Sequence, residues 1–210
     1  MTMKNFQFSI FNFQKKGFTL IETMVAVAIV TLSVAGPLFT ANSAIRGATT
    51  ARAQLTASYL AQEGIEHVRM MRDNEFLTTY HEGGIDISAT AWTRFLTNPV
   101  TDSSSISGCR TTASQSSVCM LETYPGTIAG TGSGLTLEPC VGDCRPLRLV
   151  NGIYTQKTNI GGDIMPFVRT IQVKDVPNAT DDVQVISTVS WSYHGIPYAV
   201  KIYDHITPWQ

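Results

Sequence analysis

Charged side chains are almost absent from one long stretch of this 210-residue chain. From Phe18 to Ile45 the only formally charged residue is Glu22. The part of the chain after this stretch is nowhere strongly basic, so nothing in it predicts the phosphate neutralisation that nucleic-acid binding requires. We therefore expect no nucleic acid among its partners.

Motifs for catalysis and metal binding are also missing. The histidines have no metal-ligand spacing, and there is neither a Gly-x-Ser-x-Gly elbow nor a phosphate loop. The run Gly130 to Gly134 lacks the lysine of a phosphate loop and favours a flexible loop. Asp181-Asp182 offers two carboxylates where calcium takes roughly six to eight oxygens, and favours a solvated turn. We expect no enzymatic activity, no metal and no cofactor. The histidines are His67, His81, His194 and His205.

The apolar stretch is long enough to cross a membrane once. Residues 18–45 as a helix reach roughly 42 Å, more than a hydrocarbon core. The hydrophobic fraction of the whole chain, 43%, is ordinary, which excludes a polytopic protein. Lys4, Lys15 and Lys16 precede the stretch without any acidic residue, so we expect this flank to stay in the cytoplasm.

Cysteines are few and are confined to the part that this orientation places across the membrane. The chain has four of them. Disulfides persist in such a compartment, so we expect two. Three pairings are possible, and the short spacing between Cys140 and Cys144 favours a local loop that leaves Cys109 to pair with Cys119. A zinc site made of all four thiolates is the alternative.

The segment Lys15-Lys16-Gly17-Phe18-Thr19-Leu20-Ile21-Glu22 resembles the processing site of type IV pilins and pseudopilins, where a basic pair and Gly precede Phe-Thr-Leu-Ile-Glu. The resemblance is specific over residues 15–45 and only architectural elsewhere. It implies that residues 1–17 are a leader, that a prepilin peptidase cuts between Gly17 and Phe18, and that the same enzyme methylates the Phe18 amine. The alternative is an ordinary signal, cut after the apolar region near small residues 26–28 or 34–36.

Glu22 is the candidate assembly residue. A carboxylate inside a membrane is unfavourable by a few kcal/mol, so it is usually retained for a partner. The resemblance implies that Glu22 pairs with the Phe18 amine of a neighbouring subunit as apolar helices bundle. The alternative is that Glu22 reaches the lipid headgroups only four residues from the cut.

The order of patterns predicts an α+β protein. We expect a membrane and assembly helix over 18–45, its amphipathic continuation over 46–77, a disulfide-containing, loop-rich region over 78–146, and an antiparallel sheet over 147–210. Pro37 predicts a kink or an unwound stretch in the first segment. The expected buried stripe of the second is Ala57, Leu60, Ala61, Gly64, Ile65, Val68 and Met71.

Four runs predict the strands of that sheet. They are 147–154, which contains a tight turn at Asn151-Gly152, and 167–176, 183–193 and 198–206. Apolar and polar residues alternate along 183–193, except at Ile186 and Ser187. The segment 194–197 is expected to be a hairpin turn. A long N-terminal helix followed by an antiparallel sheet again resembles pilins.

The sequence therefore predicts a structural subunit of a type IV pilus or a secretion pseudopilus. A minor subunit is favoured, because the mature chain is long and Pro37 lies two positions earlier than in the commonest major pilins. The expected partners are other pilin subunits, the prepilin peptidase and methylase, the inner-membrane assembly machinery, and lipid before assembly. The expected location is the cytoplasmic membrane, then an extracellular pilus or periplasmic pseudopilus. The alternative is a surface adhesive or ligand-binding domain on an uncleaved signal anchor.

Overall fold

The computed structural model describes residues 17–97, 106–111, 117–123, 135–140, 142–157 and 160–208. The chain divides into two compact units, residues 1–49 and 50–210. Some predictions fall on residues outside the described ranges: the leader before Gly17, with its basic pair Lys15-Lys16, and the run Gly130 to Gly134. The second unit is called the head below.

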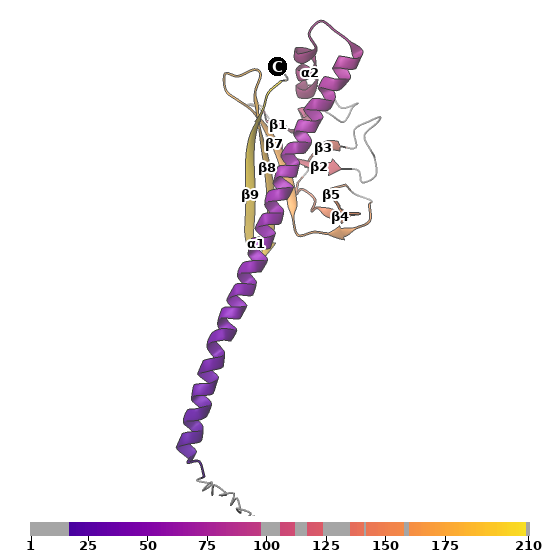
Figure 1. The fold of residues 1–210 in the computed structure, drawn as a ribbon. Coiled ribbons are helices and arrows are strands. Elements are labelled where there is room, and N and C mark those ends of the chain that lie inside the picture. Colours follow the sequence, from indigo (N-terminus) through magenta and orange to yellow (C-terminus); the bar gives the residue numbers. More distant parts are fainter. Residues whose placement is uncertain are drawn as a thin grey trace, which may run out of the picture. The chain divides into compact units, whose positions relative to one another are not determined.

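Helix α1 runs from Leu20 to Glu82 (Figure 1). It continues five residues beyond the predicted end at residue 77. The helix ends where Gly83 adopts a positive φ of 74°, a conformation that glycine takes without steric penalty and that commonly terminates helices. All seven residues of the expected stripe are buried, so the predicted core face is confirmed.

Helix α2, Ile87–Thr97, lies in a region where the sequence predicted mostly loops and short strands. That prediction was wrong for these eleven residues. The local signal is nevertheless present: the Asp86 carboxylate accepts a hydrogen bond from the Ala89 amide at 3.1 Å, which is an N-terminal cap. Ala91, Trp92, Phe95 and Leu96 form one buried face. The many threonine and serine residues concealed this apolar stripe.

The main sheet of the head has six strands and is antiparallel except for one parallel pair, β1 with β7. Its order is β3-β2-β7-β8-β9, and β1 also pairs with β7. Strands from the loop-rich region therefore join strands from the end of the chain. Their bounds are β1 Arg110–Thr111, β2 Cys119–Thr123, β3 Leu135–Pro139, β7 Val168–Asp175, β8 Val183–Tyr193 and β9 Ile196–Ile206. A single-turn helix, Ser107–Cys109, precedes β1.

The first predicted hairpin forms, but in a separate small sheet. Strands β4, Arg148–Val150, and β5, Ile153–Thr155, pair around Asn151-Gly152. Both turn residues have positive φ, 50° and 83°, as the tight turn requires. Strand β6, Asp163–Ile164, pairs with the other edge of β4.

Strands β8 and β9 form the longest hairpin, closed by the two residues His194 and Gly195. Both have positive φ, so the turn is shorter than the predicted 194–197 and β9 already begins at Ile196. The predicted break in alternation along β8 is not a bulge, because pairing to both neighbours is continuous. Ser187 simply occupies a buried position on the face that meets α1.

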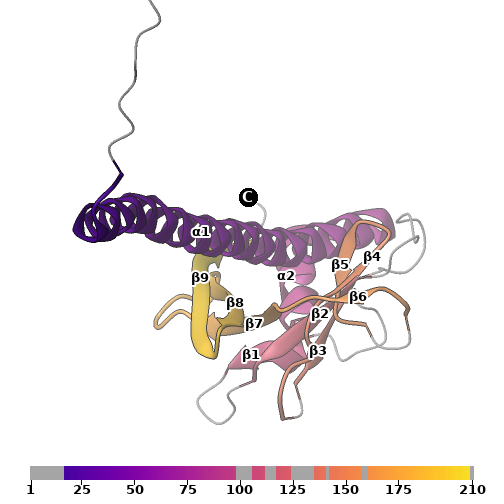
Figure 2. The same cartoon turned by 90° about the horizontal axis from the view of Figure 1, so that it is seen from below.

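The core of the head lies between α1 and the sheet. One cluster joins Ile65, Val68 and Met71 of α1 to α2 and to strands β2, β7 and β8. A second joins Ala57, Leu60 and Ala61 to Leu147, Phe167, Val189 and Trp191. Seen from below, the part of α1 that belongs to the head runs along one side of the strands (Figure 2). The predicted pilin-like α+β fold, a long N-terminal helix packed against an antiparallel sheet, is confirmed.

Gly64 marks the closest approach of α1 to the sheet. A methyl group there would lie 2.6 Å from Ser187 Oγ and 2.9 Å from Ile171 Cδ1. Overpacking of this kind costs about 1–3 kcal/mol, so Gly64→Ala should lower the melting temperature of the head. This temperature is measured by near-UV circular dichroism of the full chain in detergent micelles. Gly47→Ala, where a methyl group meets nothing within 4 Å, is the matched control and should not lower it. Equal melting temperatures would contradict this packing.

Candidate processing and assembly site

The predicted cleavage residues lie immediately before α1. Gly17, Phe18 and Thr19 are exposed and outside regular secondary structure, and the Phe18 side chain is 76% exposed. In the uncleaved chain Phe18 carries an amide, so the amine that Glu22 is predicted to bind arises only after cleavage. The peptide bond between Gly17 and Phe18 is thus accessible within the described residues, and the assignment as the cleavage site stays a prediction.

Thr19 starts the helix. Its carbonyl accepts a hydrogen bond from the Glu22 amide at 3.0 Å, and its hydroxyl lies 3.4 Å from the same nitrogen. Thr19 and Glu22 have the spacing of a capping box, in which a Thr at the cap and a Glu three residues later satisfy the first amides of the helix. Sequence reasoning missed this second role, although Thr-x-x-Glu before an apolar run is its usual signal.

Glu22 lies in the first turn of α1 and is exposed. Its negative charge near the positive end of the helix dipole is locally favourable. Within the described part of the chain, no ion pair involves its carboxylate.

The residues that follow Glu22 are apolar and face outward on all sides. By length and composition, α1 is the one described helix that is able to cross a membrane. Apolar area left in water is unfavourable by about 25 cal/mol per Å², so covering this segment with lipid or with other apolar helices would be favourable. The most exposed large side chains of this segment are Phe39, Leu32, Met24 and Ile45.

Pro37 does not unwind the helix. Helical structure is continuous from Leu20 to Glu82, so the predicted unwound stretch is absent from the described chain. Proline removes one amide donor, but the turns on either side keep their hydrogen bonds. The Thr40 hydroxyl also donates to the Gly36 carbonyl at 3.0 Å, within the turn that contains Pro37.

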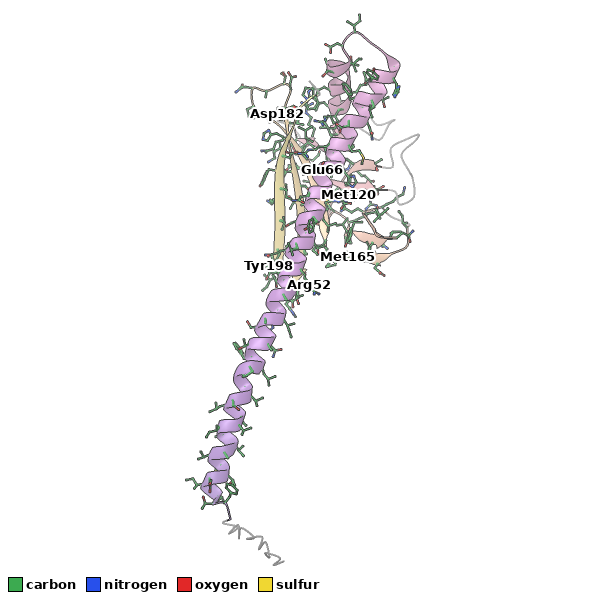
Figure 3. The ribbon with its side chains drawn as sticks, in the orientation of Figure 1. Arg52, Glu66, Met120, Met165, Asp182 and Tyr198 are labelled. Atoms are coloured by element: carbon green, nitrogen blue, oxygen red, sulfur yellow. A yellow bond between two sulfur atoms is a disulfide. The ribbon has the colours of Figure 1, made fainter. Side chains whose placement is uncertain are left out.

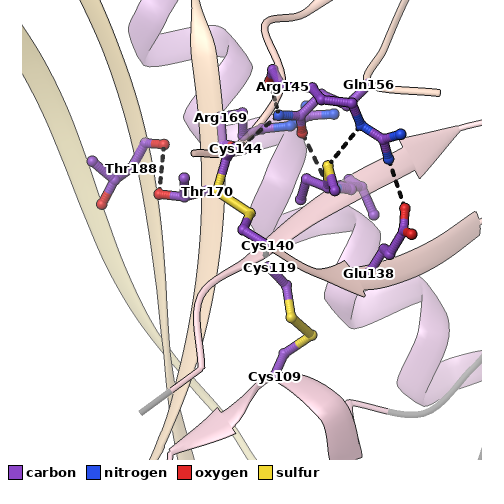
Figure 4. The surroundings of a disulfide bond; sticks show 12 residues. Cys109, Cys119, Glu138, Cys140, Cys144, Arg145, Gln156, Arg169, Thr170 and Thr188 are labelled. Atoms are coloured by element: carbon purple, nitrogen blue, oxygen red, sulfur yellow. Dashed lines mark hydrogen bonds and ion pairs between the residues drawn. A yellow bond between two sulfur atoms is a disulfide. The ribbon is translucent and has the colours of Figure 1, made fainter. Parts of the chain in front are cut away.

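The four cysteines form two disulfides, Cys109–Cys119 and Cys140–Cys144 (Figure 4). This is the pairing that the spacing favoured, and it leaves no free cysteine for the zinc alternative. The Cα atoms are 5.6 and 5.2 Å apart. Cys119 opens β2, so the first bridge ties the segment before β1 to the main sheet.

Next to the second disulfide, Arg145 joins the two strands β2 and β3. Its Nη2 lies 2.6 Å from a carboxylate oxygen of Glu122. The same nitrogen lies 2.6 Å from a carboxylate oxygen of Glu138, a contact that Figure 4 shows. Burial, together with the neighbouring Glu138, raises the pKa of Glu122 despite the charge of Arg145. The side chain of Gln156 donates to the Arg145 carbonyl at 2.7 Å and so links this cluster to the segment after β5.

Loss of the two disulfides should have unequal effects. The bridges close loops with sequence separations of 10 and 4, and loop-closure entropy predicts stabilisation of about 3 and about 2 kcal/mol. Replacing Cys109 and Cys119 by Ser should therefore lower the thermal stability of the head more than replacing Cys140 and Cys144 by Ser.

Thiol titration tests the two disulfides directly. Titration of the unfolded, unreduced protein should find no free thiol in the parent chain. Four titratable thiols would contradict the disulfides.

Two of the four histidines lie beside carboxylates. The His205 Nδ1 lies 2.8 Å from Asp182, and the His67 Nε2 lies 3.4 Å from Glu63. Over the described ranges, no group of three or more His, Cys, Asp or Glu side chains is placed to hold a metal ion. The glycine run 130–134 lies outside those ranges.

Comparison with known proteins adds one finding at the start of the chain. Residues 12–36 match the family model for the prokaryotic N-terminal methylation motif. No curated protein and no solved structure matches the chain. The matched motif contains the predicted cleavage site and Glu22, and it leads into a long helix packed against an antiparallel sheet. The motif and the fold together confirm the resemblance, and they indicate a member of the type IV pilin and pseudopilin family.

Proposed function

We propose that this chain is a structural subunit, and a minor one, of a type IV pilus or a related secretion pseudopilus. The observation that carries the proposal is Glu22, a carboxylate at the start of an outward-facing apolar helix and within the matched methylation motif. Pilin-family proteins are generally structural rather than enzymatic. The proposed role is accordingly to assemble, not to catalyse.

The proposed maturation has two steps at one peptide bond. A prepilin peptidase cuts between Gly17 and Phe18 and removes residues 1–17, and the new Phe18 amine is then methylated. Methylation keeps the nitrogen basic and positively charged. Residues 18–45 hold the mature chain in the cytoplasmic membrane until assembly, with the head on the far side.

The proposed assembly step removes two unfavourable charges from lipid together. The Glu22 carboxylate of one subunit meets the Phe18 ammonium of its neighbour as their apolar helices bundle. A charge pair in a low-dielectric core is far more favourable than either charge alone. The pairing would also set the axial register of each incoming subunit, since the two groups are only four residues apart in the sequence. Other pilin subunits, the peptidase and the inner-membrane assembly machinery are the proposed partners.

Analysis of filaments sheared from cells distinguishes this proposal from the alternative of a membrane-anchored surface domain. Surface or periplasmic filaments are sheared from cells, sedimented and analysed by intact mass. We expect this chain among the filament subunits, with a mass that starts at methylated Phe18. Recovery only from the membrane fraction, with residues 1–17 still attached, would favour the uncleaved signal anchor instead.

A further inference from the structure

Among the described residues of the head, Arg169 of β7 is the one completely buried cation, and it lies beneath α1. Its Nη1 donates to the Glu63 carboxylate at 2.9 Å and to the Leu60 carbonyl at 3.3 Å. The Glu63 side chain is 34% exposed. A guanidinium from the sheet thus reaches two adjacent turns of the helix.

Stability alone does not explain this arginine. Its Nε and Nη2 have no hydrogen-bond partner among the described residues, and burial lowers its pKa although Glu63 opposes that effect. For Glu63, burial by itself would raise the pKa. The hydrogen bond with His67 and the charge of Arg169 outweigh this effect and bring the pKa of Glu63 below its ordinary value. An apolar residue at a site of this kind is often as stable as an ion pair, whereas a buried pair is best known for specifying one arrangement.

The helix meets the sheet most closely at the next residue, Gly64. Its Cα faces Ser187 Oγ, Ile171 Cδ1 and the Arg169 side chain, and a Cβ there would clash with the first two. The dipeptide Glu-Gly occurs once within α1, at residues 63 and 64. A carboxylate beside the contact glycine is therefore available at a single position along the helix.

Apolar packing on its own would accept a displaced helix. The buried apolar positions of α1 recur every three or four residues, and two of them are alanine, so a shift by one turn again presents an apolar stripe to the sheet. A shift by three residues would bring Glu66 opposite Arg169, but would put His67 where only Gly64 fits. A shift by four would bring His67 opposite Arg169 and Val68 into the glycine contact.

We propose that Arg169, Glu63 and Gly64 form a register lock, a contact that fixes the axial and rotational position of α1 on the sheet of the head. The charge pair selects the residue that faces β7, and the glycine contact excludes the neighbouring registers. The lock thereby determines which helix side chains stay outward, among them Leu55, Tyr59 and Met70. It concerns residues 50–210 only and does not rest on the proposed function.

Distances between spin labels test the lock in the full chain in detergent micelles. Strand β9 follows α1: Tyr198 packs in the cluster of Ala57, and Asp204 pairs with Arg69. Tyr198 lies level with Arg52 at one end of the sheet, and Asp182 lies at the other end (Figure 3).

The labels are attached to cysteines that replace exposed residues, two in each sample. One label always replaces Gln62 on the helix. The other replaces either Ser192 or Tyr203, which lie toward opposite ends of the hairpin of β8 and β9. The native cysteines, all in disulfides, stay unlabelled.

The parent chain should give one narrow distance for each pair of labels. In Arg169→Met we expect a second population in which one distance grows and the other shrinks, because a one-turn slip moves the helix by roughly 5.4 Å. The matched control is Arg69→Met, which removes a partly exposed ion pair to Asp204 at the same interface and should keep both distances.

If Arg169→Met retains both parent distances, the lock is wrong. If that variant does not fold, Glu63→Gln decides the question, because it keeps the shape and one acceptor oxygen of a half-exposed side chain. A second, slipped population in Glu63→Gln supports the lock, and parent distances in that variant overturn it.

Discussion

Glu22→Leu should enter the membrane and be cut after Gly17 like the parent chain, yet should be absent from sheared filaments. The substitution removes a carboxylate whose insertion is unfavourable by a few kcal/mol, so insertion should not suffer. Assembly should fail, because each incoming subunit would bury a Phe18 ammonium without its partner. An uncompensated buried charge destabilises by about 3–5 kcal/mol, which lowers incorporation by more than a hundredfold.

The hydrogen bonds at the start of α1 make a second substitution necessary. Thr19 and Glu22 have the spacing of a capping box. The residue three positions after the cap in such a box is either glutamate or glutamine. Glu22→Gln therefore keeps the cap and removes the charge. If charge pairing drives assembly, Glu22→Gln should fail as Glu22→Leu does; if the cap matters, Glu22→Gln should assemble.

Quantification of this chain in sheared filaments, relative to the membrane fraction, measures both variants. Thr23→Leu is the matched control, since it changes the adjacent exposed residue and leaves the charge in place. Parent levels of Glu22→Leu in filaments would overturn the pairing mechanism and favour a simple membrane anchor.

Gly17→Arg should stop maturation completely. The carbonyl of Gly17 is the proposed scissile one, and a long side chain there would obstruct the approach of a membrane protease to a bond that is exposed in the structure. The precursor should accumulate in the membrane with residues 1–17 attached. Intact-mass analysis of the membrane fraction measures this.

Gly17→Ala is the graded control, because a single methyl group obstructs much less than a guanidinium and should leave most of the chain processed. Normal maturation of Gly17→Arg would contradict the assignment of the cleavage site between Gly17 and Phe18. The result is independent of the Glu22 variants, which are expected to be cut normally.

Patterns that are local in the sequence predicted the start of the chain and much of its secondary structure. The motif around Gly17 and Phe18, the apolar run with its one carboxylate and the buried stripe from Ala57 to Met71 all depend on residues within a few turns of one another. Helix periodicity and turn chemistry act over that same range, which is why the stripe and the Asn151-Gly152 turn were predicted correctly. Helix α2 was missed although its cap and apolar face are also local, because threonines and serines surround them.

Tertiary structure alone decided which distant segments meet. Strands β2 and β3, which come from the loop-rich region, join the main sheet beside β7, whereas the predicted first hairpin forms part of a different sheet. Contacts between residues far apart in sequence determine these strand partners. Ser187 interrupts the apolar and polar alternation of β8, and only the tertiary structure places it opposite Gly64. Arg169 looked like an ordinary charged residue of β7, and only the packing of α1 buries it against Glu63. Sequence determines what each segment is able to form locally, whereas the fit between helix and sheet determines which polar residues become buried.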